Sequence, residues 1–340
     1  MAFLKLSRDG VAGKAALALR CALGVAMIAG PAAVARAQTA SQNYPVKPVR
    51  LIAPFPAGGS SDLIARIVAQ RLSEGFPNQV IVENRPGAGS NLGTQLAARA
   101  APDGYTLLIT SVTAAINATL FKNPGYDLMK DFAPIAKLAV GPTALVVHPS
   151  LPVQNVQQFI KLAQSRPGQL NYGSGGVGTP AHICGEMFRV MAKVNIAHVP
   201  YKGTGQSVTD LMAGQIQFVF ASMPVVFPHM KTGRLRTLAV TGAARTPLAP
   251  NLPTVAESGI PGYAFDSWWG LVTNTGAPQF IVSTLSTEVR RIQQLPDVKE
   301  RFAELGIDVL QGSPQELLAF TRAEIDRFAK IIRDTGIRAE

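Results

Sequence analysis

The chain has 340 residues, which at roughly 100–200 residues per domain suggests two domains. Its hydrophobic fraction of 47% can supply a large core and excludes a wholly disordered chain. The net charge is +11, but the basic residues are scattered, so we expect no nucleic-acid partner, and two distant cysteines exclude a cysteine-based zinc or iron–sulfur site.

The first 37 residues have the pattern of a secretory signal peptide. Basic residues in the first 20 positions precede an apolar run over residues 21–35, and Ala35-Arg36-Ala37 places small residues at −3 and −1 of a cleavage site. The run contains Pro31 and is shorter than the ~20 residues that span a bilayer, which argues against a membrane anchor. We therefore predict cleavage after Ala37 and a periplasmic protein whose remaining cysteine, Cys184, is buried and inert.

After this segment, short apolar strands alternate with helical segments. In the first part of the chain, strands are predicted over residues 49–54, 79–83 and 105–110, with helices from Leu63 onward and over 91–100. The second part repeats the pattern, with strands over 144–147, 170–172, 196–199, 218–220 and 235–240, and helices over 153–164, 179–192 and 207–213. The tail is helical over 280–292, 297–305 and 314–333.

This alternation predicts an α/β fold with a mostly parallel sheet covered by helices. Stretches rich in proline and glycine at 139–143 and 259–262 are candidate crossover points between two domains.

Two glycine-rich loops, each between a strand and a helix, are the candidate binding elements. The first is Pro54-Phe-Pro-Ala-Gly-Gly-Ser-Ser-Asp62 and the second runs from Tyr172 to His182. Consecutive glycines let the backbone approach a ligand closely. The helix that follows offers unpaired N–H groups and the positive end of its dipole, which suit a carboxylate or phosphate. The alternative is that both are ordinary capped turns that bind nothing.

Other chemistries fit these loops less well. Gly173, Gly175 and Gly178 spell G-x-G-x-x-G, but no acidic residue ends the next strand, so no dinucleotide cofactor is predicted. Neither loop has the Lys-Ser/Thr pair of a P-loop or the G-x-S-x-G of a hydrolase elbow. The four histidines lack metal-ligand spacing, so no metal is expected. A serine hydrolase pairing Ser174 with His182 or His198 stays open.

Motifs along the chain resemble those of one receptor family. The chain is similar, over residues 44–335, to the extracytoplasmic solute-binding proteins of tripartite tricarboxylate transporters, the Bug/TctC family. The resemblance rests on segments in the same order, namely residues 44–52, 54–62, 83–91 (ENRPGAGSN), 103–108, 131–135, 172–179, 199–203 (VPYKG), 252–259 and 269–270.

The resemblance implies a type II periplasmic binding protein fold, in which two α/β domains close on a ligand in the cleft between them. It implies a discontinuous domain 1 of residues 38–141 plus 262–340, and a domain 2 of residues 142–261. By position it implies these ligand-binding residues: Phe55, Pro56, Ala57, Gly58, Gly59, Ser60, Asp62, Ser111, Ser174, Gly175, Gly176, Gly178, Thr179, His182, Tyr201, Ala221 and Ser222.

Five positions have particular expectations. A carboxylate at Asp62 would repel an anionic ligand, so we expect it to accept from backbone N–H groups or pair with Arg66. Lys202 could face the cleft or solvent, and Trp269 is expected in the core. Gln217 and Ala221 stand where the family often has acids, so we hypothesise that amino acids are not the preferred ligands.

The function implied is that of a periplasmic receptor, not an enzyme, with no cofactor. It would capture a mono-, di- or aromatic carboxylate and deliver it to the membrane permease subunits of a tripartite transporter. We expect a monomer, because hinge closure needs free domains. A ligand-sensing subunit of a signalling system is the alternative that the sequence leaves open.

Overall fold

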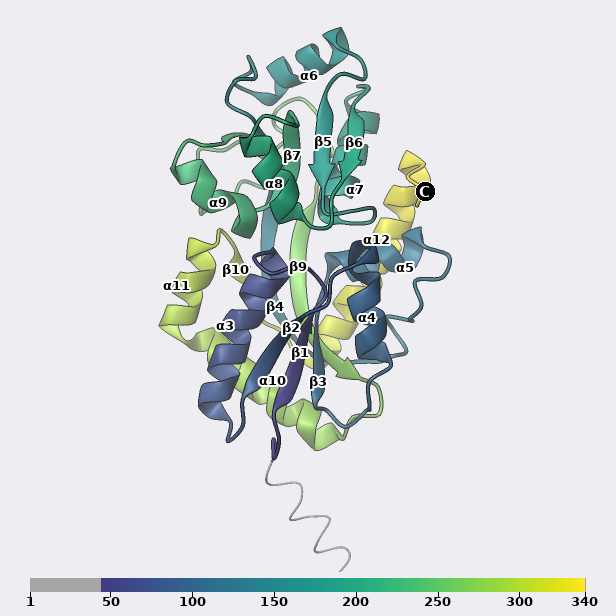
Figure 1. Cartoon of the computed structure of the whole chain (residues 1–340), viewed down its shortest axis with the longest axis vertical. Helices are drawn as coiled ribbons and strands as arrows, with labels where there is room; N and C mark the ends of the chain where they lie inside the picture. Colours follow the sequence, from purple (N-terminus) through teal and green to yellow (C-terminus); the bar gives the residue numbers. More distant parts are fainter. Residues whose placement is uncertain (1–43, 340) are drawn as a thin grey trace, which may run out of the picture. The chain divides into compact units, whose positions relative to one another are not determined.

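The computed structural model describes residues 44–339, and the predicted signal peptide lies outside them. From Lys47 onward the chain forms one compact unit (Figure 1). Its centre is a ten-stranded sheet in the order β2-β1-β3-β9-β4-β7-β5-β6, with β8 and β10 also paired to β4.

The first sheet half carries the N-terminal strands. Here β1 (Val49–Ala53) lies between β2 (Val80–Asn84) and β3 (Thr106–Ser111), all parallel. Apart from Arg50, β1 is apolar and fully buried, as expected for a strand covered on both faces. The surrounding elements are α3 (Ser60–Gly75), η1 (Ala88–Ser90), α4 (Asn91–Ala98), α5 (Val112–Leu120), α10 (Gln279–Gln294), α11 (Pro296–Glu304) and β10 (Asp308–Val309).

The second sheet half is built from the middle of the chain. In it β5 (Asn171–Ser174) lies parallel to β6 (Ala197–Pro200) and β7 (Phe218–Ser222). An edge-on aromatic pair, Phe159 and Phe218 with ring centroids 4.8 Å apart, lies in its core. The other elements are α6 (Val156–Ser165), α7 (Pro180–Met191), α8 (Thr204–Met212), α9 (Met223–Lys231) and β8 (Arg236–Val240).

Two long strands join the sheet halves. β4 (Phe132–Val147) pairs with β9 (Asp266–Asn274) as far as Pro142, and with β7 and β8 from Thr143 onward. All these pairings are antiparallel, as are β3 with β9 and β10 with β4. The prediction of a mostly parallel sheet is therefore wrong, because β4 and β9 run against their neighbours and make the sheet mixed.

The predicted strands and helices are confirmed within a few residues at their ends. The sequence analysis missed α5, α9, β9, β10 and the first part of β4. Pro134, Gly141 and Pro142 obscured the β4 pattern. The strand nevertheless continues through all three, with shifts of register between Pro134 and Ala136 and between Lys137 and Ala139.

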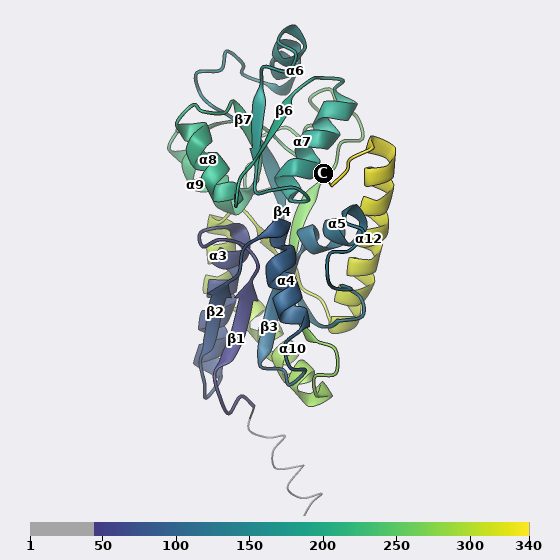
Figure 2. The same ribbon diagram turned by 45° about the vertical axis from the view of Figure 1, so that its right-hand side comes forward.

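The C-terminal helix α12 (Pro314–Thr335) packs along the two joining strands (Figure 2). A capping box between Ser313 and Glu316 starts it. Its Phe320 ring meets Trp268 at 5.3 Å, and Glu324 Oε2 accepts from Trp268 Nε1 at 2.9 Å. Helix α12 contacts both α5 and α7, so it supports both sheet halves near the point where they join. Cys184 is buried and unpaired, as expected.

Candidate functional site

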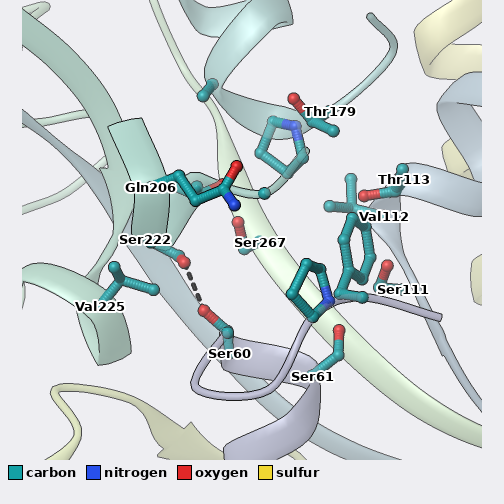
Figure 3. Close-up of a pocket in the computed structure, with 18 of the residues that line it drawn as sticks. Ser60, Ser61, Ser111, Val112, Thr113, Thr179, Gln206, Ser222, Val225 and Ser267 are labelled. Carbon is teal, nitrogen blue, oxygen red and sulfur yellow. Dashed lines mark hydrogen bonds between the residues drawn. The ribbon is translucent and has the colours of Figure 1, made fainter. Parts of the chain in front are cut away.

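A cavity of about 290 Å³ opens between the two sheet halves (Figure 3). Its walls come from both halves and from β9. The lining residues are Phe55, Pro56, Ala57, Gly59, Ser60, Ser61, Ser111, Val112, Thr113, Thr179, Pro180, Ala181, Gly203, Thr204, Gly205, Gln206, Thr209, Phe220, Ser222, Val225, Ser267 and Trp269.

Five helices begin at this cavity. They are α3 and α5 from the first sheet half, and α7, α8 and α9 from the second. Their N-cap residues Gly59, Ser111, Thr179, Gly203 and Ser222 make no side-chain cap to the first turn. The first-turn N–H groups are therefore not capped by side chains, and each helix end acts like about half a positive charge.

The cavity wall contains no charged side chain. Its polar groups are the hydroxyls of serines and threonines and the amide of Gln206, and its apolar groups include Phe55, Phe220 and Trp269. Backbone N–H groups, and those hydroxyls that do not already donate within the protein, can donate to an oxyanion. The site is therefore suited to a small anion, and it offers no carboxylate to pair with a cation.

Asp62 holds the first loop in shape from behind the cavity. It is 2% exposed, and its Oδ2 accepts from Gly58 N at 2.9 Å and from Arg66 Nε at 3.1 Å. Asn84 Nδ2 donates to Oδ1 at 2.9 Å. Burial alone would raise the pKa of Asp62, but the hydrogen bonds from Arg66, Gly58 and Asn84 outweigh it and hold the pKa below its usual value. The expected role of Asp62 is confirmed.

The second loop is held by its own hydroxyls. Ser174 is fully buried, and its Oγ lies 2.6 Å from His198 Nε2 and accepts from Gly176 N at 3.0 Å. Thr179 Oγ1 donates to Gly176 O at 2.7 Å. Ser174 lines neither this cavity nor the second one described below.

Close contacts connect the two sheet halves around the cavity. Ser60 Oγ and Ser222 Oγ are 2.5 Å apart (Figure 3). A Cβ on Gly203 would lie 2.8 Å from Pro56 Cγ, and one on Gly178 would overlap Asn117 Oδ1. Glycine at these positions allows the loops of opposite halves to approach one another.

A second cavity of about 470 Å³ shares Phe55 with the first. Its wall combines the 86–90 segment with the second glycine loop, and is formed by Phe55, Pro86, Gly87, Ala88, Gly89, Ser90, Phe121, Gly175, Gly176, Val177, Tyr201 and Lys202. Lys202 is exposed and is the one charged residue in this wall.

The structure divides the predicted site residues into three groups. The first cavity, between the two sheet halves, is called the main cavity from here on. The predicted residues in its wall are Phe55, Pro56, Ala57, Gly59, Ser60, Ser111, Thr179 and Ser222. Those in the second cavity but not the main one are Gly175, Gly176 and Tyr201. Those in neither wall are Gly58, Asp62, Ser174, Gly178, His182 and Ala221.

Ala221 is not brought to the cavity because side chains alternate along β7. Phe220 and Ser222 face the cavity, whereas Ala221 packs with Val219 in a separate apolar cluster. His182 is buried and its Nδ1 accepts from Gly178 N at 3.3 Å. Burial lowers the pKa of His182.

Several lining residues were missed by the sequence analysis. Ser61 adjoins predicted residues, while Thr113, Ser267 and the start of α8 carried no strong pattern. The Gly203-Thr-Gly-Gln206 run was the available signal for a third glycine-containing helix start. Trp269 is 4% exposed, in line with the expected core position, and it also lines the cavity.

Within residues 44–339, no three histidine, cysteine or acidic side chains gather as metal ligands would. None of the helices described in this range has the length and apolar character of a membrane span.

A mixed α/β fold with an uncharged, donor-rich cavity between its halves is that of a two-domain solute-binding protein. Comparison with known proteins indicates the same class of protein. The family model "Tripartite tricarboxylate transporter family receptor" matches residues 64–337. The chain belongs to this family of periplasmic receptors.

Individual relatives cover nearly the whole chain. The protein BugT of Bordetella pertussis is 34% identical over 304 residues, which are 89% of this chain and 93% of that protein. The structure of R. palustris Rpa4515 with adipate is 36% identical, has a TM-score of 0.85, and covers 87% of this chain and 99% of that one. MatC of Rhodopseudomonas palustris with bound malate is 29% identical, has a TM-score of 0.81, and covers 85% and 100%.

Proposed function

We propose that the protein captures a small carboxylate in the main cavity and delivers it to the permease subunits of a tripartite transporter. The observation that carries this proposal is the convergence of five helix N-termini on a cavity with no charged side chain in its wall. A carboxylate there would accept from backbone N–H groups and hydroxyls, with each charge-assisted bond contributing roughly 1.5–3 kcal/mol. Several such bonds exceed the cost of immobilising a small ligand.

The comparisons support a carboxylate of modest size. One similar structure holds adipate and another holds malate. A cavity of about 290 Å³ lies just below the range of roughly 300–1,000 Å³ for small-molecule sites, which suits a small ligand. The aromatic wall of Phe55, Phe220 and Trp269 would contact the carbon skeleton of a mono-, di- or aromatic acid.

Capture would occur by closure of two domains, residues 38–141 plus 262–340 and residues 142–261. The change of partners along β4 between Pro142 and Thr143 supports a boundary there. Closure brings loops of opposite halves together at pairs such as Ser60 with Ser222. The closed form is then the one that the permease would recognise.

The N-terminal sequence supports a periplasmic location. We propose that cleavage after Ala37 releases a monomer that begins at Gln38. N-terminal sequencing of protein isolated from the periplasm should begin at Gln38. We propose no reaction for this site, because Ser174 lies outside both cavity walls.

A thermal-shift titration tests the proposal. Protein purified from the periplasm and stripped of ligand is screened against adipate, malate and other mono- and dicarboxylates. The uncharged diamide of each diacid and the methyl ester of each acid are the matched controls. A ligand at ~100 times its dissociation constant adds ~2.7 kcal/mol of stability.

We expect at least one acid to raise the melting temperature while its uncharged counterpart does not, and chromatography to recover that acid unchanged. Consumption of the acid would indicate an enzyme, and the absence of a shift with every acid would contradict the proposal. Deleting the gene should then abolish cellular uptake of the acid that binds.

A further inference from the structure

Not every polar group of the main cavity can donate to a ligand. Thr179 Oγ1 already donates to Gly176 O at 2.7 Å, and Thr209 Oγ1 to Gly205 O at 3.1 Å. These hydroxyls offer only lone pairs to the cavity. The pair Ser60 and Ser222 share one hydrogen bond with each other. The cavity wall therefore has fewer side-chain groups that can donate a hydrogen bond to a ligand than it has hydroxyls.

Gln206 is such a donor, and it lies in the first turn of α8. Its Oε1 accepts from the backbone N of Lys202 at 3.2 Å. Because a backbone N–H can only donate, this bond fixes which end of the amide is oxygen and directs Nε2 away from Lys202. Figure 3 shows the amide nitrogen of Gln206 facing the cavity. Among residues 44–339, no acceptor is bonded to this nitrogen.

The turn that orients Gln206 is itself held firmly. Tyr201 N donates to Ser174 O at 3.0 Å, and Tyr201 OH donates to Asp210 Oδ2 at 2.9 Å on the next turns of α8. A Cβ on Gly175 would lie 2.9 Å from Thr204 Oγ1, so the start of α8 packs directly on the second glycine loop. A side chain held this way loses little freedom when it binds a ligand.

Gln206 is also exposed, which places it at the mouth of the cavity rather than at its base. Figure 3 shows Ser111, Val112 and Thr113 at the start of α5 on the opposite wall. A ligand whose carboxylate lies among the buried helix starts would thus turn its other end toward Gln206. No acidic side chain lines the cavity to receive an ammonium group there.

We propose that Gln206 reads the outer end of the ligand, and that the preferred ligand carries a hydrogen-bond acceptor there and not an ammonium group. This inference rests on the proposed function, since it assigns the second contact of an acid already bound by its first carboxylate. The acceptor can be a second carboxylate, a carbonyl or an amide oxygen.

Three ligands of equal carbon number test whether the site prefers an acceptor, an ammonium group or no polar group at the outer end. Calorimetric titration compares a diacid, the ω-amino acid and the unsubstituted monoacid, taken over four to eight carbons so that the best chain length is included. Each is titrated into the wild-type protein, Gln206→Glu and Gln206→Leu. Glutamate keeps the acceptor for Lys202 N but replaces the donor with a negative charge. The matched control is Gln157→Glu, the same charge change at an exposed position on α6.

At the best chain length we expect the wild type to bind the diacid at least tenfold more tightly than the ω-amino acid. Gln206→Glu should weaken diacid binding about tenfold or more, strengthen ω-amino acid binding, and change monoacid binding less than threefold; a tenfold change corresponds to 1.4 kcal/mol. Gln206→Leu should remove the preference for the diacid over the monoacid. Gln157→Glu should change none of the three.

If Gln206→Glu weakens the diacid and the monoacid equally, or changes neither, Gln206 does not read the outer end and the inference is wrong, while the proposed function stands. If the wild type binds none of the acids at any length, the proposed function and this inference fall together.

Discussion

The two glycine-rich loops look alike in sequence, yet the structure holds them in different ways. The loop before α3 is fixed by a carboxylate from behind, because Asp62 accepts from Gly58, Arg66 and Asn84. The loop before α7 has no such carboxylate. It uses its own hydroxyls instead, with Ser174 bonded to His198 and Gly176, and Thr179 bonded to Gly176.

This difference decides what each loop can offer a ligand. Since Asp62 supports the first loop, the side chains of Ser60 and Ser61 remain in the cavity wall. In the second loop the hydroxyls are used for support, and the backbone at the start of α7 is what remains for the ligand. We therefore expect the loss of a side-chain hydroxyl to weaken binding more in the first loop. In the second loop, we expect a larger effect from substitutions of glycine that displace the backbone.

The largest effect is expected for alanine at Gly178, the left-handed glycine that precedes α7. Gly178 has φ +80°, and a Cβ there would overlap Asn117 Oδ1 across the two sheet halves. Asn117 cannot move easily, because its Nδ2 donates to Gly89 O at 2.8 Å and Asn91 Oδ1 at 2.9 Å. Gly178→Ala should thus hinder closure and weaken carboxylate binding by more than about 30-fold, or about 2 kcal/mol, as measured by calorimetry.

Gly58→Ala is the matched control for this substitution. Gly58 has φ +78° but nothing lies within 4 Å of a Cβ there, so only backbone strain of about 1 kcal/mol is added. Its effect on binding should be severalfold smaller than that of Gly178→Ala. Equal effects would mean that strain, and not the contact with Asn117, dominates.

The next effect concerns the support of the first loop. Asp62→Asn replaces an acceptor-only carboxylate with an amide that cannot accept at both positions, which disturbs the bonds from Gly58 and Asn84. We expect a loss of about 2 kcal/mol in unfolding free energy and about tenfold weaker binding. Chemical denaturation and calorimetry measure the two quantities. Weakened stability with unchanged affinity would show that this loop does not contact the ligand.

A smaller effect separates hydroxyls inside and outside the cavity. Ser61→Ala removes a hydroxyl from the cavity wall and should weaken binding severalfold, by about 1 kcal/mol, with little loss of stability. Ser174→Ala leaves buried partners unsatisfied, so it should lower stability by about 1–2 kcal/mol and change affinity less. The opposite ranking in a binding titration would place Ser174 and not Ser61 against the ligand.

The smallest effect is a pH dependence of stability that traces to Asp62. Its folded-state pKa is held below the usual value, so its contribution is complete above the unfolded pKa of about 3.9 and is lost as the pH falls through the folded value. The difference in melting temperature between wild type and Asp62→Asn should be constant from pH 5 to 8 and shrink below about pH 4. A difference that instead grows on acidification would contradict this account of Asp62.

The sequence predicted the first loop well because its pattern is local. Two glycines, two serines and an aspartate follow a strand, and the acid lies four residues before its partner Arg66. The inward turn of Ser174 was not predictable, because it depends on His198 arriving from the next strand. In the same way, the sequence does not state which face of β7 meets the cavity, and Ala221 was assigned to the wrong one.

Helix α5 shows a second kind of failure. Its residues follow β3 without a glycine or proline, so no turn residue in the sequence marks the start of the helix. In the structure α12 packs against both α5 and β4, and such contacts between distant segments are not visible in the local sequence. Ser111 and Thr113 therefore line the cavity although they belong to no recognisable sequence motif.

The most direct test of the account is a crystal structure of the protein with the acid that binds most tightly. We predict carboxylate oxygens in the main cavity, within about 3 Å of first-turn N–H groups of α3, α5 or α7. No lysine or arginine should contact them. A carboxylate found in the second cavity, paired with Lys202, would contradict the claim that helix N-termini and not a cationic side chain bind the ligand.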